Sequence, residues 1–437
     1  MECPEPSAEH PEPTPSYETD CSHIRKRREV QDACLKQDIE RLKFLAASEG
    51  GFLTDDLRRG AWPILLGLPA DAMVTSSQPD ASPVDDAELS WRHLPRHPDE
   101  DQVQLDVNRS FIYYPNGTAL VALRLITDSR STCVSGGTNS RVLIDLTEAD
   151  LTRRKAELSD LIIEVLRRYP FLCYFQGYHD ICQVFLLVLD PAVRAPLVAR
   201  LSLLRIRDFM LPTLAPTVAQ LRLIPDILDA ADPSLRRHLA GTEPFYALSG
   251  TLTMYAHNIE AYGDISRLFD VLLAREAVFS IYLFAQIVLS RREELFDTPD
   301  DDPSMLHLIL SKVPKKLDLE TLIAQAISLF DKYPPKSLRS WRRVSSSSCL
   351  KTAGCVEVCA GQSLAEGRGY FEAQLRELRC TERWNELIKK ARLYRRPAKA
   401  IGLAIVVGLA AMYLRKHPAP VNFLCMAFWR LTGRAMS

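Results

Sequence analysis

The sequence lacks the motifs with which many enzymes bind nucleotides or attack small substrates. Its 437 residues contain no GxxxxGK[ST] loop, GxSxG turn or HExxH helix, which are the signatures of P-loop nucleotide binding, serine hydrolysis and zinc proteolysis. His179 and Asp180 are adjacent, but neighbouring side chains diverge on a helix, so we do not expect a catalytic pair there. An enzyme that acts alone on a small molecule is therefore not predicted.

Metal clusters, disulfide frameworks and a strong charge of one sign are missing as well. The 11 cysteines include no CxxC pair, and the closest two, Cys355 and Cys359, have neither a second pair nor a nearby histidine. This pattern predicts the reduced thiols of a cytosolic protein and no metal site. Because the formal net charge is −1, no nucleic-acid partner is expected.

A secretory signal and alternating strand patterns are also absent. The N-terminal segment is acidic and proline-rich and has no basic start or apolar run, so residues 1–23 are predicted to be a disordered tail. Apolar residues recur at helical spacing over 24–47, and another helix follows with Thr54 at its N-cap position. Helical patterns come densely from residue 155 onward. The predicted fold is therefore all-α, with many packed helices.

Three stretches differ from this helical pattern. Residues 116–146 have the composition of a flexible insert, and 336–397 read as a Ser-rich linker followed by a basic segment. Residues 400–414 carry no charge and are flanked by basic residues. They predict a transmembrane anchor over 398–416, with 417–437 as a C-terminal tail. A buried core helix is the alternative for this apolar stretch, and a membrane hairpin is the alternative to a single span.

Two short segments contain candidate functional side chains. Asp106 and Arg109 are three residues apart, so on a helix the carboxylate can hold the guanidinium. In Tyr174-Phe-Gln176-Gly177, aromatic residues flank a glutamine, and the glycine permits a tight turn. By themselves, the first segment could be a surface ion pair and the second a packing turn.

Together these segments resemble the TBC domain, the Rab GTPase-activating domain. The IxxDxxR motif of that family is matched from Val103 to Arg109, and its YxQG motif is matched from Tyr174 to Gly177. The resemblance covers roughly residues 48–335, and the predicted TBC domain is assigned to residues 24–335, with the flexible insert at 116–146 inside it. Arg58 and Trp62 match the opening signature of the domain, and we assign them first to structure and second to partner contact.

The resemblance implies a mechanism and a partner. Arg109 would be an arginine finger oriented by Asp106, and Gln176 would position the attacking water, with its loop held by Tyr174 and Gly177. The partner would be a Rab-family small GTPase, which itself binds the GTP and Mg²⁺, so the chain would be an activator without a cofactor rather than an enzyme by itself. The anchored layout resembles a subgroup at the endoplasmic reticulum (ER), which implies ER-to-Golgi traffic at the ER or early Golgi membrane. The alternative is a catalytically weak scaffold that binds a Rab at the ER.

The distance between the two motifs departs from the family pattern. Arg109 and Gln176 are 67 positions apart, which is longer than the family leads us to expect. The excess lies in the insert at 116–146. A long surface loop costs little closure entropy, so the insert is compatible with the predicted domain.

Overall fold

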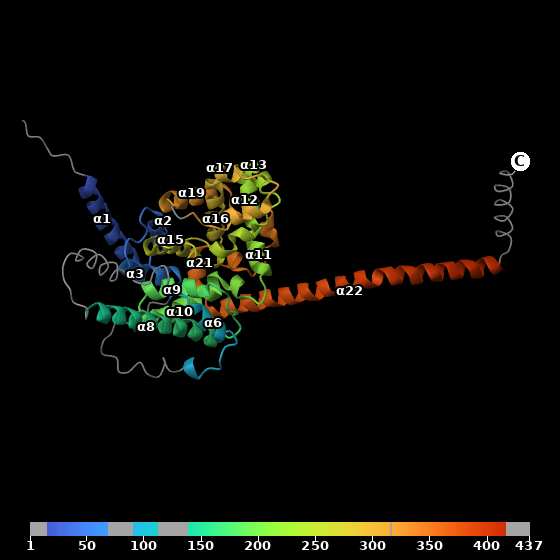
Figure 1. Ribbon diagram of the computed structural model, residues 1–437, viewed down its shortest axis with the longest axis horizontal. Coiled ribbons are helices and arrows are strands. Elements are labelled where there is room, and N and C mark those ends of the chain that lie inside the picture. Colours follow the sequence, from blue (N-terminus) through green and yellow to red (C-terminus); the bar gives the residue numbers. More distant parts are fainter. Residues whose placement is uncertain (1–14, 69–90, 112–138, 315–316, 417–437) are drawn as a thin grey trace, which may run out of the picture. The chain divides into compact units, whose positions relative to one another are not determined.

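The computed structural model describes residues 15–68, 91–111, 139–314 and 317–416. Within these ranges every regular element of secondary structure is a helix, and turns and loops connect the helices (Figure 1). The all-α prediction is confirmed. A compact unit extends to Gln374, and the chain from Leu375 onward forms a second unit.

The N-terminal helices begin earlier than the sequence predicted. The expected single helix over 24–47 is divided into α1 (Pro15–Leu35) and α2 (Ile39–Ala47). The division occurs because Asp38 accepts a hydrogen bond from the backbone N–H of Arg41 (2.9 Å) and thereby starts a new helix. Since α1 starts at Pro15, the predicted disordered tail over 1–23 is wrong from that residue on, and residues 1–14 lie outside the described part.

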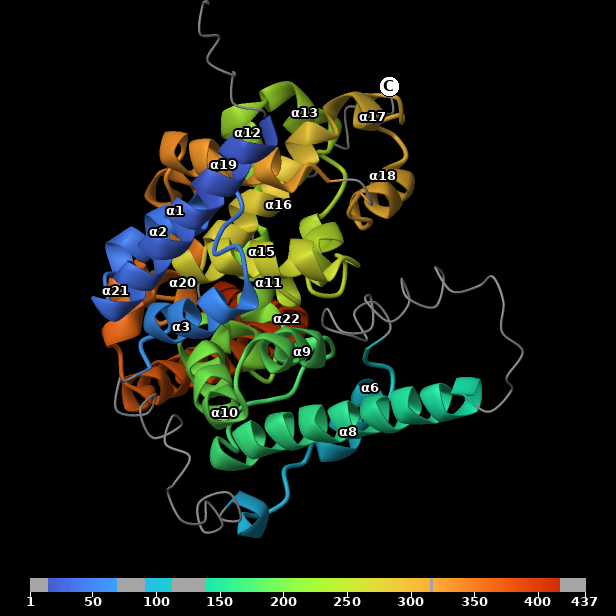
Figure 2. The same ribbon diagram turned by 90° about the vertical axis from the view of Figure 1, so that its left-hand side faces the viewer.

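The layer that carries the predicted motifs is built from α3 (Asp55–Leu65), α6 (Glu100–Val107), α8 (Asn139–Arg168), α9 (Tyr178–Val188) and α10 (Pro191–Arg200). Figure 2 shows α6 lying along the long helix α8, and these two helices pack on each other. Most of the predicted insert at 116–146 lies outside the described residues. Its last part is not a loop, because α8 already begins at Asn139.

The other helices of the compact unit form a second group, in which α16 packs on α12 and α19 while α15 packs on α2 and α3 (Figure 2). Several of the segments after α10 are short and have a proline at their start, as α11, α13, η4 and α18 do. Their bounds are η2 (Leu201–Arg205), η3 (Arg207–Met210), α11 (Ala215–Leu221), α12 (Leu223–Ala231), α13 (Pro233–His238), η4 (Pro244–Ala247), α14 (Leu248–Leu252), α15 (Tyr262–Ala274), α16 (Phe279–Ser290), α17 (Arg292–Phe296), α18 (Pro303–Leu310) and α19 (Leu319–Lys332).

The segment after α19 is folded, so the predicted linker beginning at 336 is wrong as far as Gln374. It contains η5 (Pro335–Ser337), η6 (Ser340–Arg343), α20 (Cys349–Thr352), α21 (Val356–Gly361) and the start of α22 (Leu364–Lys416). The buried carboxylate of Asp208 accepts hydrogen bonds from the backbone N–H of Cys349 (3.0 Å) and from Gln374 Nε2 (2.9 Å). Buried Arg207 donates to Gln374 Oε1 (3.2 Å) and to the carbonyl oxygen of Ser347. The segment therefore supplies partners to charges inside the domain.

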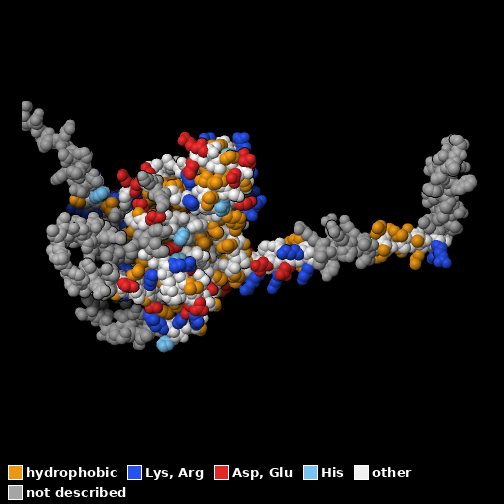
Figure 3. Space-filling view, in the orientation of Figure 1, with side chains coloured by type: hydrophobic (Ala, Val, Ile, Leu, Met, Phe, Trp, Pro, Cys, Tyr) orange, Lys and Arg blue, Asp and Glu red, His pale blue; other side chains and the backbone are white. Residues whose placement is uncertain are grey.

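The second unit consists of the rest of α22 among the described residues. Large apolar side chains along its later part are exposed: Leu403, Ile405, Val406, Val407, Leu409, Met412 and Tyr413. Figure 3 shows apolar side chains at the surface towards this end of the helix, next to basic ones. No helix in the described part of the chain is both long enough and apolar enough to cross a membrane. The predicted anchor at 398–416 is therefore not confirmed, and the side chains at 398–402 and 414 are outside the described residues.

Candidate functional site

The two predicted motifs meet in the structure through Tyr174. The backbone N–H of Tyr174 donates to Asp99 Oδ2 (2.9 Å), just before α6, and its hydroxyl donates to Asp106 Oδ2 (2.9 Å), within α6. One residue of the glutamine motif thus contacts the arginine helix at two points. The loop and the helix are held in a fixed relation although 68 residues separate Tyr174 from Asp106.

Asp106 is the buried centre of the arginine segment. Its side chain is fully buried, and it accepts hydrogen bonds from Arg109 Nη2 and from Gln102 Nε2 (3.1 Å) besides that from Tyr174. The Arg109 side chain is 61% exposed. A charge-assisted hydrogen bond to a buried carboxylate limits the rotamers of an otherwise mobile guanidinium. The buried carboxylate of Asp106 thus fixes the position of the guanidinium, while the positive charge of Arg109 remains exposed to solvent.

Gln176 is exposed at the turn that begins α9, between buried aromatic residues. The ring centroids of Phe175 and Tyr178 are 5.5 Å apart, and Gly177 has a φ of 102°, a value that suits glycine. A Cβ atom on Gly177 would lie 2.5 Å from Thr253 Cγ2. The turn therefore requires glycine both for its backbone conformation and for the close approach of Thr253.

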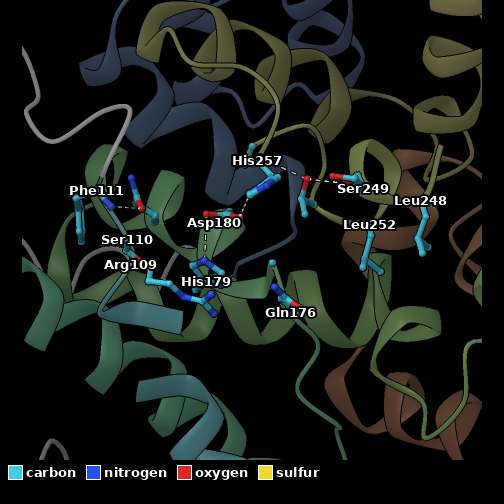
Figure 4. A pocket seen from close by; sticks show the side chains of 14 residues that line it. Arg109, Ser110, Phe111, Gln176, His179, Asp180, Leu248, Ser249, Leu252 and His257 are labelled. Carbon is cyan, nitrogen blue, oxygen red and sulfur yellow. Dashed lines mark hydrogen bonds and ion pairs between the residues drawn. The ribbon is translucent and has the colours of Figure 1, made fainter. Parts of the chain in front are cut away.

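Arg109 and Gln176 line the same cavity, which has a volume of about 440 Å³. In Figure 4 the Arg109 side chain extends towards the side of the cavity where Gln176 lies, and Leu248 and Leu252 of α14 form another wall. The backbone N–H of Phe111, the last described residue before the insert, donates to Gln183 Oε1 (3.1 Å). The exit of the chain from α6 is thereby fixed at the edge of the cavity.

Three further polar residues of the cavity were not predicted. His179 and Asp180 do contact each other, with His179 Nε2 3.3 Å from Asp180 Oδ1, and Asp180 Oδ2 is 3.1 Å from His257 Nδ1. The expectation that these neighbours diverge was wrong because both side chains turn into the cavity at the start of α9. Their place directly after the YxQG motif was a usable signal, but nothing local to residue 257 indicated its contact across 77 residues.

The two histidines have opposite pKa shifts. Burial lowers the pKa of His179, although the carboxylates of Asp180 and Asp106 oppose this effect. The hydrogen bond with Asp180 raises the pKa of His257, against its partial burial. Of the two, His257 is the one that more readily carries a positive charge in the cavity.

Arg58 and Trp62 lie away from the cavity, in the interior of the compact unit. Arg58 Nε is 3.0 Å from Asp270 Oδ1, Arg58 Nη2 is 3.1 Å from Oδ2, and Trp62 Nε1 donates to Oδ1 (2.8 Å). The backbone N–H of Phe52 also donates to this carboxylate (3.0 Å). A buried charge with this many donors is a structural anchor, which joins α3 to α15. No cluster of metal-ligating side chains occurs in the described residues.

The fold and the cavity together define a class of protein. An all-helical domain presents an exposed arginine and an exposed glutamine at one cavity. The Rab-GTPase-TBC domain family model matches residues 147–296. TBC1 domain family member 20 from Bos taurus is 32% identical over 87% of this chain and 85% of its own length. The chain belongs to the TBC family of Rab GTPase-activating proteins.

Other comparisons agree with this assignment. The GTPase-activating protein gyp10 of Schizosaccharomyces pombe is 30% identical over 80% of this chain and 84% of its own length. The crystal structure of the Ypt/Rab-GAP domain of Gyp1p has a TM-score of 0.51 at 14% identity, covering 71% of this chain and 99% of that one, which supports the fold. The family match includes Gln176 but begins after Arg109.

Proposed function

We propose that this chain accelerates GTP hydrolysis by a Rab-family GTPase, with Arg109 as an arginine finger and Gln176 as the residue that orients the attacking water. The observation that carries the proposal is that both side chains are exposed and line one cavity, while the buried carboxylate of Asp106 holds Arg109. The description of the matching family model, the Rab-GTPase-TBC domain, and the name of gyp10 as a GTPase-activating protein support the partner class. The GTP and Mg²⁺ are those of the partner.

The chemistry needs a positive charge and an oriented water. During phosphoryl transfer, negative charge accumulates on the transferred group and on the leaving oxygen, and an arginine supplied in trans neutralises it. In other GTPase systems such an arginine accelerates hydrolysis about 10³–10⁵-fold, equivalent to roughly 4–7 kcal/mol. Arg109 can supply this charge without a rearrangement of its surroundings, because Asp106 already holds the guanidinium in place.

The test is a single-turnover phosphate-release assay with a panel of purified Rab GTPases and the full chain. Arg109→Ala and Gln176→Ala should each reduce the stimulated rate at least about a hundredfold while the protein stays folded. Arg153→Ala is a matched control, because Arg153 is also about 63% exposed and pairs with Asp150 at the same i,i+3 spacing, but on α8. Gln325→Ala, at an exposed glutamine of α19, is the control for Gln176.

The outcomes separate the proposal from a scaffold function. Full stimulation by the Arg109 and Gln176 variants would contradict the assigned roles. Binding of a GTP-loaded Rab by the wild-type chain without faster hydrolysis would identify a catalytically weak scaffold instead.

We also propose that the chain works at the ER or early Golgi membrane, to which the region 398–416 attaches it. The exposed apolar side chains between Leu403 and Tyr413, followed by Arg415 and Lys416, support this proposal. Fluorescence imaging of the tagged full chain tests it. Leu403→Asp combined with Val407→Asp should release the protein from membranes, whereas Leu387→Asp, at another exposed apolar residue of α22, should not. An unchanged distribution of the double variant would contradict the proposal.

A further inference from the structure

Tyr174 lies between two groups that both contact its hydroxyl oxygen. Asp106 Oδ2 is 2.9 Å from Tyr174 Oη on one side, and His179 Nδ1 is 3.2 Å from it on the other. Asp106 is fully buried, and His179 is mostly buried. The oxygen therefore has two hydrogen-bond partners but only one hydrogen of its own.

The count of hydrogens determines which partner receives that hydrogen. The Asp106 carboxylate forms an ion pair with Arg109, and an ionised carboxylate can only accept. The tyrosine hydrogen must therefore point to Asp106, because otherwise two lone pairs would face each other over 2.9 Å. The tyrosine oxygen then offers only lone pairs to His179. For that contact to be a hydrogen bond, Nδ1 of His179 must carry a hydrogen.

The other side of the imidazole ring does not change this result. Nε2 of His179 is 3.3 Å from Asp180 Oδ1, a charge contact without hydrogen-bond geometry, whereas Nδ1 and Tyr174 Oη form a hydrogen bond at 3.2 Å. A neutral ring, which has a single N–H, therefore carries it on Nδ1, and Asp180 keeps its own partner in His257 Nδ1, at 3.1 Å from Oδ2. Burial favours the neutral ring of His179, with a lowered pKa. Whether the ring is neutral or charged, a tyrosine that donates to Asp106 requires the hydrogen on Nδ1.

We propose that His179 is a positioning residue for Arg109, acting through an Nδ1–H group that donates to Tyr174. This donation commits the tyrosine hydrogen to one oxygen of Asp106, and the other oxygen of Asp106 holds the guanidinium. The hydrogen-bond assignment depends on the structure alone. The effect on Arg109 rests on the proposed function of that residue as an arginine finger.

The hydrogen position can be measured directly by NMR on the full chain labelled with ¹⁵N-histidine. The signal of His179 is identified because it is missing from the spectrum of His179→Asn. In the wild-type spectrum this signal should show a protonated Nδ1. His238 is an internal reference for the opposite tautomer, because its Nε2 is 2.9 Å from the carbonyl oxygens of both Leu295 and Thr298 and must donate to them. An unprotonated Nδ1 in His179 of the wild-type chain would overturn the proposal, whatever the variants do.

The positioning effect is tested in the GTPase assay with matched substitutions. Asn places an amide donor near the position of Nδ1, so His179→Asn should stay within about threefold of the wild-type kcat, whereas His179→Leu should lower kcat about tenfold and leave KM within about twofold. If the leucine variant does not fold, His179→Gln, whose amide reaches the position of Nε2 instead, replaces it and should also lose kcat.

The two proposals fail in different ways. Wild-type stimulation that does not depend on Arg109 would remove the proposed function but leave the tautomer of His179 intact. A chain in which Arg109→Ala abolishes stimulation while His179→Leu and His179→Gln keep the full kcat would overturn the positioning role alone.

Discussion

At the scale of single residues, the site depends on a few side chains that hold one another, with Asp106 accepting hydrogen bonds from Arg109 and Tyr174. Local spacing predicted the ion pair between Asp106 and Arg109, and it predicted a tight turn at Gly177, which the structure confirms with a left-handed glycine. The contacts of Asp180 with His257 and of Arg58 with Asp270 could not be predicted. They join residues 77 and 212 positions apart, and periodicity within one segment contains no information about them.

Gly177 gives a prediction at this scale. Gly177→Ala should lower the free energy of unfolding by about 2 kcal/mol, because the residue keeps a positive φ and its new Cβ would lie 2.5 Å from Thr253 Cγ2. Denaturant unfolding measures this change. Adding Thr253→Ser removes the methyl group but keeps a hydroxyl that can donate to Ser249 O, as Oγ1 does now at 2.9 Å. The double variant should regain the part of the unfolding free energy that the steric clash removes. If Gly177→Ala alone is as stable as wild type, the turn tolerates a side chain and the prediction is wrong.

At the scale of elements, α8 serves as the support of the short helix α6. Arg167 holds Glu100 through two hydrogen bonds of 2.7 and 2.9 Å, Ser159 donates to Gln104 Oε1 (3.3 Å), and Lys155 donates to the carbonyl oxygen of Asn108 (2.6 Å). These contacts are spaced along the whole of α6, from its first residue to the residue before Arg109. An eight-residue helix is unstable alone, so its position depends on α8.

The pair of Arg167 and Glu100 predicts a pH-dependent stability. The hydrogen bonds from Arg167 lower the pKa of Glu100 in the folded state, against the effect of burial. A lowered pKa stabilises the fold above the unfolded value of about 4.3, and this stabilisation is lost as the pH falls through the folded-state value. Arg167→Met should therefore cost about 2 kcal/mol at pH 7 and progressively less below about pH 4. Denaturant unfolding at several pH values measures this difference, and a loss that does not change with pH would contradict the explanation.

At the scale of the whole molecule, helical periodicity was sufficient for the fold class but not for the extent of the domain. The sequence from 336 onward appeared to be a linker because its serines and short apolar runs have no helical period. In the structure Ser348 caps α20. The segment is held in the domain because it provides hydrogen-bond partners for the side chains of Arg207 and Asp208. The sequence gives no indication of these distant charges, because each is more than 130 residues away from its partner.

Truncation tests the extent of the domain. A chain ending at Gln374 should fold, whereas one ending at Pro335 leaves Arg207 and Asp208 without most of their partners inside the protein. The truncation also exposes apolar side chains that this segment covers, such as Leu203 and Leu204, and exposing a buried leucine costs about 1.5–3 kcal/mol. The shorter chain should therefore be degraded rapidly in limited proteolysis and show no cooperative thermal transition. Equal protease resistance of the two chains would mean that the segment from 336 to 374 adds nothing to the fold.

The contact between Gly67 and Ala360 has a consequence for biosynthesis. A Cβ on Gly67 would lie 1.9 Å from the carbonyl oxygen of Ala360, and Arg200 donates to the carbonyl oxygens of Leu66, Ala360 and Gln362. The ribosome releases residues 66 and 67 long before it has made residue 360. The early helices therefore cannot complete their packing until most of the chain has been synthesised. Until then Arg200 lacks two of its acceptors, the carbonyl oxygens of Ala360 and Gln362. Such an incompletely folded intermediate exposes apolar surface. We therefore expect chaperones to bind the nascent chain until its last short helices have been synthesised.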